Sequence, residues 1–218
     1  MAIELEFVNG NCVYKKDENG VEQWCEYDEQ KRLRHRLSND GNEYWYRYNE
    51  DGTTSIHYKF LDEYESWKDY YPNGRLKSSH TKWTHRTSVI ESWVEYNEKG
   101  TMISYREIND KEECITEYDE NGNEIHHKYS NGFEVWKEYD KNNNLIHYKE
   151  SVGYEEKYEY GETTKYHFKY PDGKESIYEV DDDGKTLHIK DNTGNESWYT
   201  YDENGDVLDI TTSEEEPE

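Results

Sequence analysis

A unit of about 21 residues repeats along nearly the whole chain and limits what it can fold into. The tyrosine of motifs such as Tyr118-Asp-Glu-Asn-Gly anchors each unit. Successive anchors lie 21, 22, 26, 22, 21, 21, 20 and 21 residues apart, and a fixed period of this kind is typical of repeat architectures. The nine anchors are Tyr27, Tyr48, Tyr70, Tyr96, Tyr118, Tyr139, Tyr160, Val180 and Tyr201.

Two further columns of residues keep register with the anchors. A glutamate stands five residues before every anchor, and six of the seven tryptophans stand three residues before one. Because side chains alternate across a strand, these two columns and the residue directly before each anchor are expected to share one face. The anchor itself is expected to face the other way. The nine column glutamates are Glu22, Glu43, Glu65, Glu91, Glu113, Glu134, Glu155, Glu175 and Glu196.

Each unit contains two turn signals. One follows the anchor, as at residues 119–122, and a second glycine turn lies seven residues before it, as at Gly132. Glycine tolerates the positive φ that hairpin turns need. The sequence therefore predicts an all-β fold, an elongated repeat array of about nine ~21-residue two-strand hairpin units, with about seventeen to nineteen strands. The array forms either a single twisted sheet or a β-solenoid. A three-residue loop at 130–132 would place Lys128 opposite Glu134 and His126 opposite Trp136.

The motif Tyr-Asp-x-x-Gly, with a second glycine turn about ten residues further on, resembles the YD repeat of Rhs-type proteins. The segment Tyr70–His80 also resembles a MORN-variant repeat of the sort seen in small bacterial antitoxin-like proteins. The resemblance covers about residues 9–209 and implies an array of stacked hairpins. Large Rhs proteins wrap such strands into a shell around a toxin, but this chain has too few repeats to enclose one.

Composition indicates a folded protein with a thin core. A hydrophobic content of 31% and a net charge of −25 are typical of disorder, but aromatic residues make up 16% of the chain. Buried tyrosine rings keep their hydroxyls in water. We expect residues 1–210 to form a single β-hairpin repeat domain and residues 211–218 to form a disordered acidic tail. Neither a signal peptide nor a membrane segment is recognisable, so the expected location is cytoplasmic.

Catalytic and metal-binding patterns are not recognisable. The segment from Asp140 begins like a calcium loop but lacks the required glycine and glutamate, so we interpret it as an Asx turn. His35, His126, His147 and His188 each stand eight residues after an anchor. One histidine per repeat leaves them too far apart to share an ion. The sequence therefore predicts no enzyme activity, no cofactor and no metal.

The excess of acids favours binding to a basic surface. The chain has 51 acids against 26 bases, and nucleic acids present regularly spaced phosphates to basic tracks on proteins. An array of column glutamates could occupy such a track, although a solvated, lysine-paired face is the alternative. The predicted partner-binding residues are Glu22, Glu43, Glu65, Glu91, Glu113, Glu134, Glu155, Glu175, Glu196, Asp181, Asp182, Asp183, Trp83 and Arg86.

The repeat is broken between Tyr70 and Tyr96, where the unit is about five residues too long. The extra segment, Lys77–Ser88, carries no acid and forms the one basic stretch of the sequence. It predicts either a binding loop anchored by Trp83, since tryptophan and arginine are favoured in binding hot spots, or a longer hairpin in which Trp83 packs on a neighbour.

Three hypotheses for function follow. The first is an inhibitor of the immunity, antitoxin, anti-CRISPR or anti-defence type, which mimics nucleic acid and binds a basic nuclease or nucleic-acid-binding protein. Such a protein would be a monomer or dimer and would itself bind neither nucleic acid nor membrane. The second is a glycan- or cell-wall-binding aromatic repeat module. The third is a non-catalytic scaffold, because open sheet edges invite pairing.

Overall fold

The computed structural model describes residues 3–213, and these residues contain no helix. Accordingly, no helical membrane span occurs in this part of the chain. The described residues form twenty strands, more than expected because Glu4–Val8 pairs as a strand ahead of the first anchor. The strands are β1 Glu4–Val8, β2 Asn11–Lys16, β3 Glu22–Tyr27, β4 Leu33–Ser38, β5 Asn42–Tyr48, β6 Thr54–Phe60, β7 Tyr64–Tyr70, β8 Leu76–His85, β9 Ser88–Tyr96, β10 Met102–Asn109, β11 Glu112–Tyr118, β12 Glu124–Tyr129, β13 Glu134–Tyr139, β14 Leu145–Glu150, β15 Glu155–Tyr160, β16 Thr164–Lys169, β17 Glu175–Val180, β18 Thr186–Lys190, β19 Glu196–Tyr201 and β20 Val207–Ser213.

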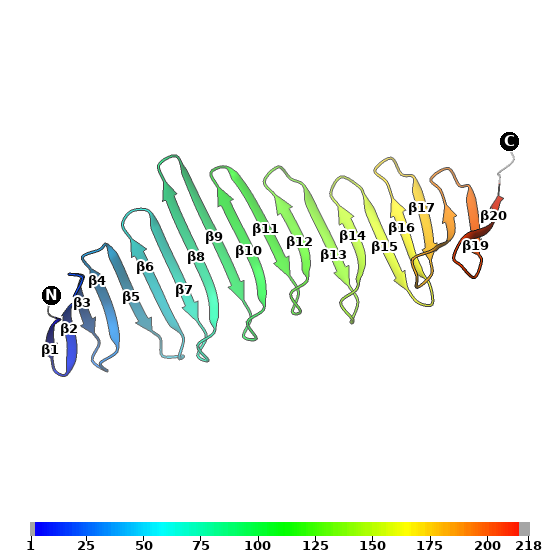
Figure 1. Ribbon diagram of the computed structural model, residues 1–218. Coiled ribbons are helices and arrows are strands. Elements are labelled where there is room, and N and C mark those ends of the chain that lie inside the picture. The colour runs from blue at the N-terminus through cyan, green and yellow to red at the C-terminus, as the bar shows by residue number, and fades with distance from the viewer. Residues whose placement is uncertain (1–2, 214–218) are drawn as a thin grey trace. The chain divides into compact units, whose positions relative to one another are not determined.

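The chain divides into two compact units, one ending at Gly122 and one beginning at Asn123. The first unit contains β1–β11 and the second contains β12–β20. Within each unit the strands follow one another in chain order, with turns alternating between two edges (Figure 1). Among the described residues, the strands of a unit contact only their neighbours in the chain. Each unit is therefore an open hairpin array, which confirms the all-β repeat fold and excludes a closed solenoid within a unit.

The single domain expected over residues 1–210 stays a prediction. The last strand, β20, continues to Ser213, three residues past that boundary. The added residues pair with β19, where Ser213 lies opposite Glu196. Residues 214–218 of the predicted acidic tail lie outside the described part of the chain. An array in which each hairpin contacts only its neighbours can divide between any two of them, which is why the repeat pattern did not reveal the division at Gly122.

The predicted register is confirmed at the hairpin of β12 and β13. Lys128 lies opposite Glu134, and His126 lies opposite Trp136. Gly132 provides the positive φ of the turn, at 86°. The column glutamates and tryptophans therefore share one face of the sheet, which we call the Trp face, and the opposite side is called the Tyr face.

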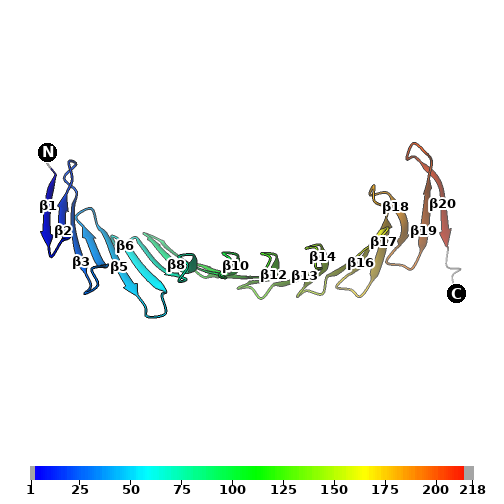
Figure 2. The same ribbon diagram turned by 90° about the horizontal axis from the view of Figure 1, so that it is seen from below.

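Neither unit has a second layer. Figure 2, in which the sheet is seen from below, shows the strands of each unit lying in one layer. Within residues 3–213, Val135 is the one apolar side chain counted as buried, and it retains 8% exposure. The other buried residues are the small polar Ser38, Ser66, Thr116 and Ser176. A charged face and a hydroxyl-rich face leave no broad aliphatic surface that would recruit another layer.

Side-chain hydrogen bonds hold the turns that follow the anchors. In one of them, the Oδ1 of Asp140 accepts hydrogen bonds from the backbone N–H groups of Asn142 at 2.8 Å and Asn144 at 2.9 Å. This is the Asx-turn geometry expected from the sequence. The fourth residue after the anchor has positive φ at Lys31, Gly52, Gly74, Gly100, Gly122, Asn143, Gly184 and Gly205.

Four anchor tyrosines hydrogen-bond to the backbone of the strand before their own. The hydroxyl of Tyr27 donates to the carbonyl of Cys12 at 3.0 Å, and Tyr48 donates to Leu33 at 3.0 Å. The same bond, to the carbonyl 15 residues earlier, is made by Tyr160 and Tyr201. A phenylalanine would fill the same space without this bond, which explains why the anchor is tyrosine.

Candidate functional site

The column glutamates are paired along the whole Trp face. Each of the nine lies within 4 Å of a histidine, lysine or arginine nitrogen. Glu134 is held by Lys128 at 2.9 Å and by His126 at 3.1 Å. These two neighbours, Lys128 first, hold the pKa of Glu134 below its ordinary value. The nine glutamates predicted to bind a partner thus form an internally paired row, and their role in binding stays a prediction.

Histidines supply a regular part of this pairing. In six repeats a histidine Nε2–H donates to the column glutamate of the next strand, at 2.8 Å for His35 and Glu43 and for His147 and Glu155. His57 approaches Glu65 less closely, at 3.9 Å. In six of the seven pairs the histidine precedes the glutamate by eight residues. Alignment on the anchors missed His57, because the β5–β6 ladder lacks the register shift of β3–β4 and His57 therefore stands nine residues after its anchor, not eight.

Histidine and tryptophan rings also stack across the Trp face of the first unit. We call this series the Trp–His stack; it consists of His35, Trp45, His57, Trp67, His80 and Trp93. The rings come from six consecutive strands, β4–β9, and successive centroids are 5.5, 4.6, 4.8, 4.7 and 4.5 Å apart. The guanidinium of Arg106 closes the series over Trp93 at 4.7 Å. Ring faces in the stack are covered by other rings, so mainly ring edges face solvent.

The histidines are therefore used in stacking and in bonds to glutamates. Within residues 3–213, no three His, Cys, Asp or Glu side chains stand close enough together to hold a metal ion. Burial lowers the pKa of His57, which lies between Trp45 and Trp67. This arrangement keeps His57 neutral at pH 7 and suits a structural role.

A second set of acids stands directly before the anchors; in the second unit two of the three are exposed, while Glu179, at 25%, is half-buried. In the second unit, Glu138, Glu159 and Glu179 directly precede the anchors on β13, β15 and β17. Glu138 contacts His147 at 3.2 Å yet keeps 67% of its side chain exposed, and Glu179 contacts Lys165 at 3.8 Å. Glu159 is exposed and takes part in no ion pair within residues 3–213. These residues lie at the ends of their strands, beside the turns that follow the anchors.

Those turns add exposed acids at the same edge. They are Glu162, Asp182, Asp183 and Glu203. Asp181, which was predicted to bind a partner, accepts hydrogen bonds from the backbone of Asp183 at 3.0 Å and Lys185 at 2.8 Å. Asp182 and Asp183 remain exposed. We define the acidic edge of the second unit as Glu138, Glu159, Glu162, Glu179, Asp182, Asp183 and Glu203.

The segment Lys77–Ser88 is not a binding loop. It belongs mainly to β8 and the start of β9, which continue the ladder to His85 and Ser88. Trp83 packs against Tyr64 on the neighbouring strand, with ring centroids 4.4 Å apart, and remains 56% exposed. Of the two predicted alternatives, the longer hairpin with Trp83 packed on a neighbour is confirmed, because the extra residues lengthen both strands. Whether Trp83 and the exposed turn residue Arg86 contact a partner stays a prediction.

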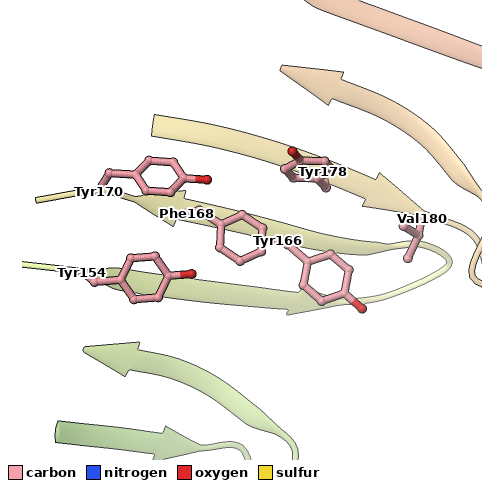
Figure 3. Close-up of a pocket in the computed structure, with 6 residues that line it drawn as sticks. All are labelled: Tyr154, Tyr166, Phe168, Tyr170, Tyr178 and Val180. Carbon is pink, nitrogen blue, oxygen red and sulfur yellow. The ribbon is translucent and has the colours of Figure 1, made fainter. Parts of the chain in front are cut away.

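An aromatic groove lies on the Tyr face of the second unit. It has a volume of about 390 Å³ and is lined by Tyr154, Tyr166, Phe168, Tyr170, Tyr178 and Val180. Figure 3 shows these side chains along β15–β17. The sequence analysis did not single out this groove, because its residues fill ordinary tyrosine positions of the repeat. The run of aromatic residues at Tyr166, Phe168 and Tyr170 was the available signal.

Carboxylates adjoin the groove and accept tyrosine hydroxyls. Tyr154 donates to Glu156 at 2.6 Å, and Tyr158 donates to the other oxygen of the same carboxylate. On the next strand, Tyr148 donates to Glu150 at 2.7 Å. Partial burial, followed by this bond, raises the pKa of Tyr148 to about 12. The hydroxyls hold the carboxylates in place without neutralising their charge.

Comparisons with known proteins give limited information. No family model matches the chain, and no curated protein matches it. The chain is similar to a crystal structure of TcdB2-TccC3, with a TM-score of 0.37 and 12% identity over 95% of this chain, and to one of TcdB2-TccC3-Cdc42, with a TM-score of 0.36 and 11% identity over 94%. It spans 15% of the length of those chains.

A protein of unknown function from Bacteroides fragilis NCTC 9343 is 13% identical, with a TM-score of 0.17 over 69% of this chain and 89% of its own. Values this low carry no conclusion about function. The stacked hairpins that the resemblance to YD repeats implies are nevertheless present in the strand pairing.

Proposed function

We propose that this chain is an acidic protein-binding inhibitor that occupies a basic, nucleic-acid-binding surface of a partner. The biological setting would be of the immunity, antitoxin, anti-CRISPR or anti-defence type, and the chain would be cytoplasmic and non-catalytic. The observation that carries the proposal is the division of acids into two sets. The nine column glutamates are all paired with bases, whereas five of the seven acids of the acidic edge, all but Glu138 and Glu179, form no ion pair within residues 3–213.

The geometry of the acidic edge suits this role. Glu138, Glu159 and Glu179 lie on every second strand, so their rows are about 10 Å apart. Glu162, Asp182 and Asp183 extend the same edge into the turns. Exposed carboxylates at regular intervals attract a track of lysines and arginines over long range, and the remaining charge of the chain adds to this steering.

The experiment is an affinity pull-down from a host lysate, at about 50 mM and about 500 mM salt, because the interaction should be screened. Each captured protein is then purified and its binding to labelled nucleic acid is measured with and without this chain. We expect displacement of the nucleic acid at low salt. Capture that does not respond to salt, or a captured protein that still binds nucleic acid in the presence of this chain, would contradict the proposal.

A matched pair of variants locates the surface. The edge variant carries Glu162→Gln, Asp182→Asn, Asp183→Asn and Glu203→Gln. The control variant carries Glu18→Gln, Glu29→Gln, Glu50→Gln and Glu98→Gln, all exposed acids of the first unit. Both lose the same number of charges. We expect the edge variant to bind the partner about tenfold more weakly and the control about twofold; equal losses would refute the assignment to this edge.

A further inference from the structure

The rings of the groove on the Tyr face are tilted against one another, in contrast to the Trp–His stack, and leave a volume of about 390 Å³ beside them. In the stack, adjacent planes between Trp45 and Trp93 differ by 17° or less. In the groove, Tyr154 and Tyr170 are tilted by 53°, and Phe168 and Tyr178 by 82°. Tyr166 and Phe168 are parallel, but their centroids are 6.3 Å apart. An aromatic ring is negative on its face, so the ring faces of the groove favour a cation.

The charges around the groove favour the same kind of ligand. On β14–β16 the lysines point to the Trp face: Lys149 lies opposite Trp136, Lys165 opposite Glu159 and Lys169 opposite Glu155. The Tyr face of these strands carries the carboxylates of Glu150 and Glu156 among tyrosines and Phe168. On these three strands the Tyr face therefore carries acids and no lysine; on β13, Lys137 lies opposite Tyr148 and is paired with Glu124.

The first unit shows which cation this face accepts. The guanidinium of Arg36 lies 4.1 Å from the ring centre of Tyr44, its cross-strand neighbour on the Tyr face. Arg32 lies over Tyr48 at 4.4 Å. Within residues 3–213, no arginine or lysine lies over the groove rings in this way. The second unit thus presents the same aromatic surface without an arginine of its own.

We propose that the groove lined by Tyr154, Phe168 and Tyr178 binds an arginine side chain of a basic protein partner. The guanidinium lies against the ring faces and donates to Glu156, while its aliphatic stem covers the apolar floor. A volume of about 390 Å³ accommodates one such side chain. Val180 at the groove directly precedes the Asp181–Asp183 turn, so the groove opens next to the acidic edge. The inference rests on the proposed function for the identity of the partner.

The test is an NMR titration of the full chain with two peptides of equal charge, one alternating arginine and glycine and one alternating lysine and glycine. We expect the arginine peptide to shift amide signals of β15–β17 and to bind at least about threefold more tightly than the lysine peptide. Equal binding of the two peptides would overturn the proposal. So would shifts confined to other strands, or binding of a chitin oligosaccharide at these residues without any response to arginine.

Variants separate the groove from bulk charge. Glu156→Gln removes the charge and keeps an acceptor oxygen for one of the two tyrosine hydroxyls, and Phe168→Leu keeps apolar bulk but removes a ring face. Each should weaken the arginine peptide about fivefold or more. Asp209→Asn removes an exposed acid on β20, outside both the groove and the acidic edge; it is the matched control and should change affinity by less than about twofold. Equal effects of Glu156→Gln and Asp209→Asn would overturn the groove.

The two proposals fail separately. If a captured basic partner binds both groove variants as tightly as the unaltered chain, the groove proposal is wrong and the proposed function stands. If the arginine peptide binds the groove as expected while no nucleic-acid-binding protein is displaced from its nucleic acid, the groove stands and the proposed function is wrong.

Discussion

Trp67→Leu is expected to destabilise the middle of the Trp–His stack locally. Trp67 stacks on His57 at 4.8 Å and on His80 at 4.7 Å, and leucine keeps apolar bulk but removes both ring contacts. Aromatic pairs contribute about 0.5–1.5 kcal/mol each beyond the area they bury. Two pairs therefore amount to about 1–3 kcal/mol, or about 5- to 150-fold in an opening equilibrium. Because strands contact only their chain neighbours, the loss should be confined to β6–β8 and the strands next to them.

Amide hydrogen exchange measures this local opening. The matched control is Trp198→Leu, since Trp198 stacks on one ring, His188 at 5.0 Å, and faces Thr211 on its other side. We expect exchange to rise about 2- to 12-fold around Trp198 and by the larger factor in β6–β8 for Trp67→Leu. If both substitutions raise exchange by the same factor, the central rings add nothing beyond a single pair and the reasoning is refuted.

Three further predictions concern the turns and the paired glutamates. Lys31 has φ of 62°, so Lys31→Gly should raise the free energy of unfolding by about 1 kcal/mol. Gly184 has φ of 78°, so Gly184→Ala should lower it by about 1–2 kcal/mol. Denaturant unfolding measures both, and a lower free energy of unfolding in Lys31→Gly would contradict the strain argument. Asp140→Ala removes the acceptor of two turn N–H groups and should cost about 1–2 kcal/mol, measured as faster exchange in β13 and β14; unchanged exchange would show that the turn does not need it. The lowered pKa of Glu134, caused first by Lys128, means that this pair stabilises the fold above the ordinary value of 4.5 and that its contribution is lost as the pH falls through the lowered pKa. Glu134→Gln should therefore flatten the acid limb of a stability–pH profile, and an unchanged limb would count against the pairing.

Much of the fold could be predicted because the residue columns of the repeat keep a constant spacing from the anchor. The length of the loop at Gly132 places Lys128 opposite Glu134, and the register of this one hairpin determines which columns lie on each face of the sheet. The choice between an open array and a solenoid could not be made from sequence, because both keep the same alternation of side chains. It is decided by which strands meet, and within each unit, over residues 3–213, a strand contacts only its neighbours in the chain.

The candidate site was less predictable. Alignment on the anchors did not place His57 and His80 in the histidine column. The β5–β6 ladder lacks a register shift, and β8 and β9 are longer than the other strands. The Trp–His stack was therefore not predicted. The pairing of the column glutamates depends on diagonal contacts from the preceding strand, such as His35 to Glu43, which a one-dimensional alignment does not display. The groove at Phe168 depends on how its ring is tilted against that of Tyr178, and this tilt cannot be predicted from the residue types.

The single-layer construction has a thermal consequence. The heat capacity of unfolding arises mainly from apolar surface newly exposed to water. In residues 3–213, Val135 is the one apolar residue counted as buried, and many others are already hydrated in the native state. The heat-capacity change per residue should therefore fall below the usual ~12–15 cal/mol/K. The stability curve of this protein is accordingly broad and shallow, and folding depends less on temperature than it does in a domain with a closed core.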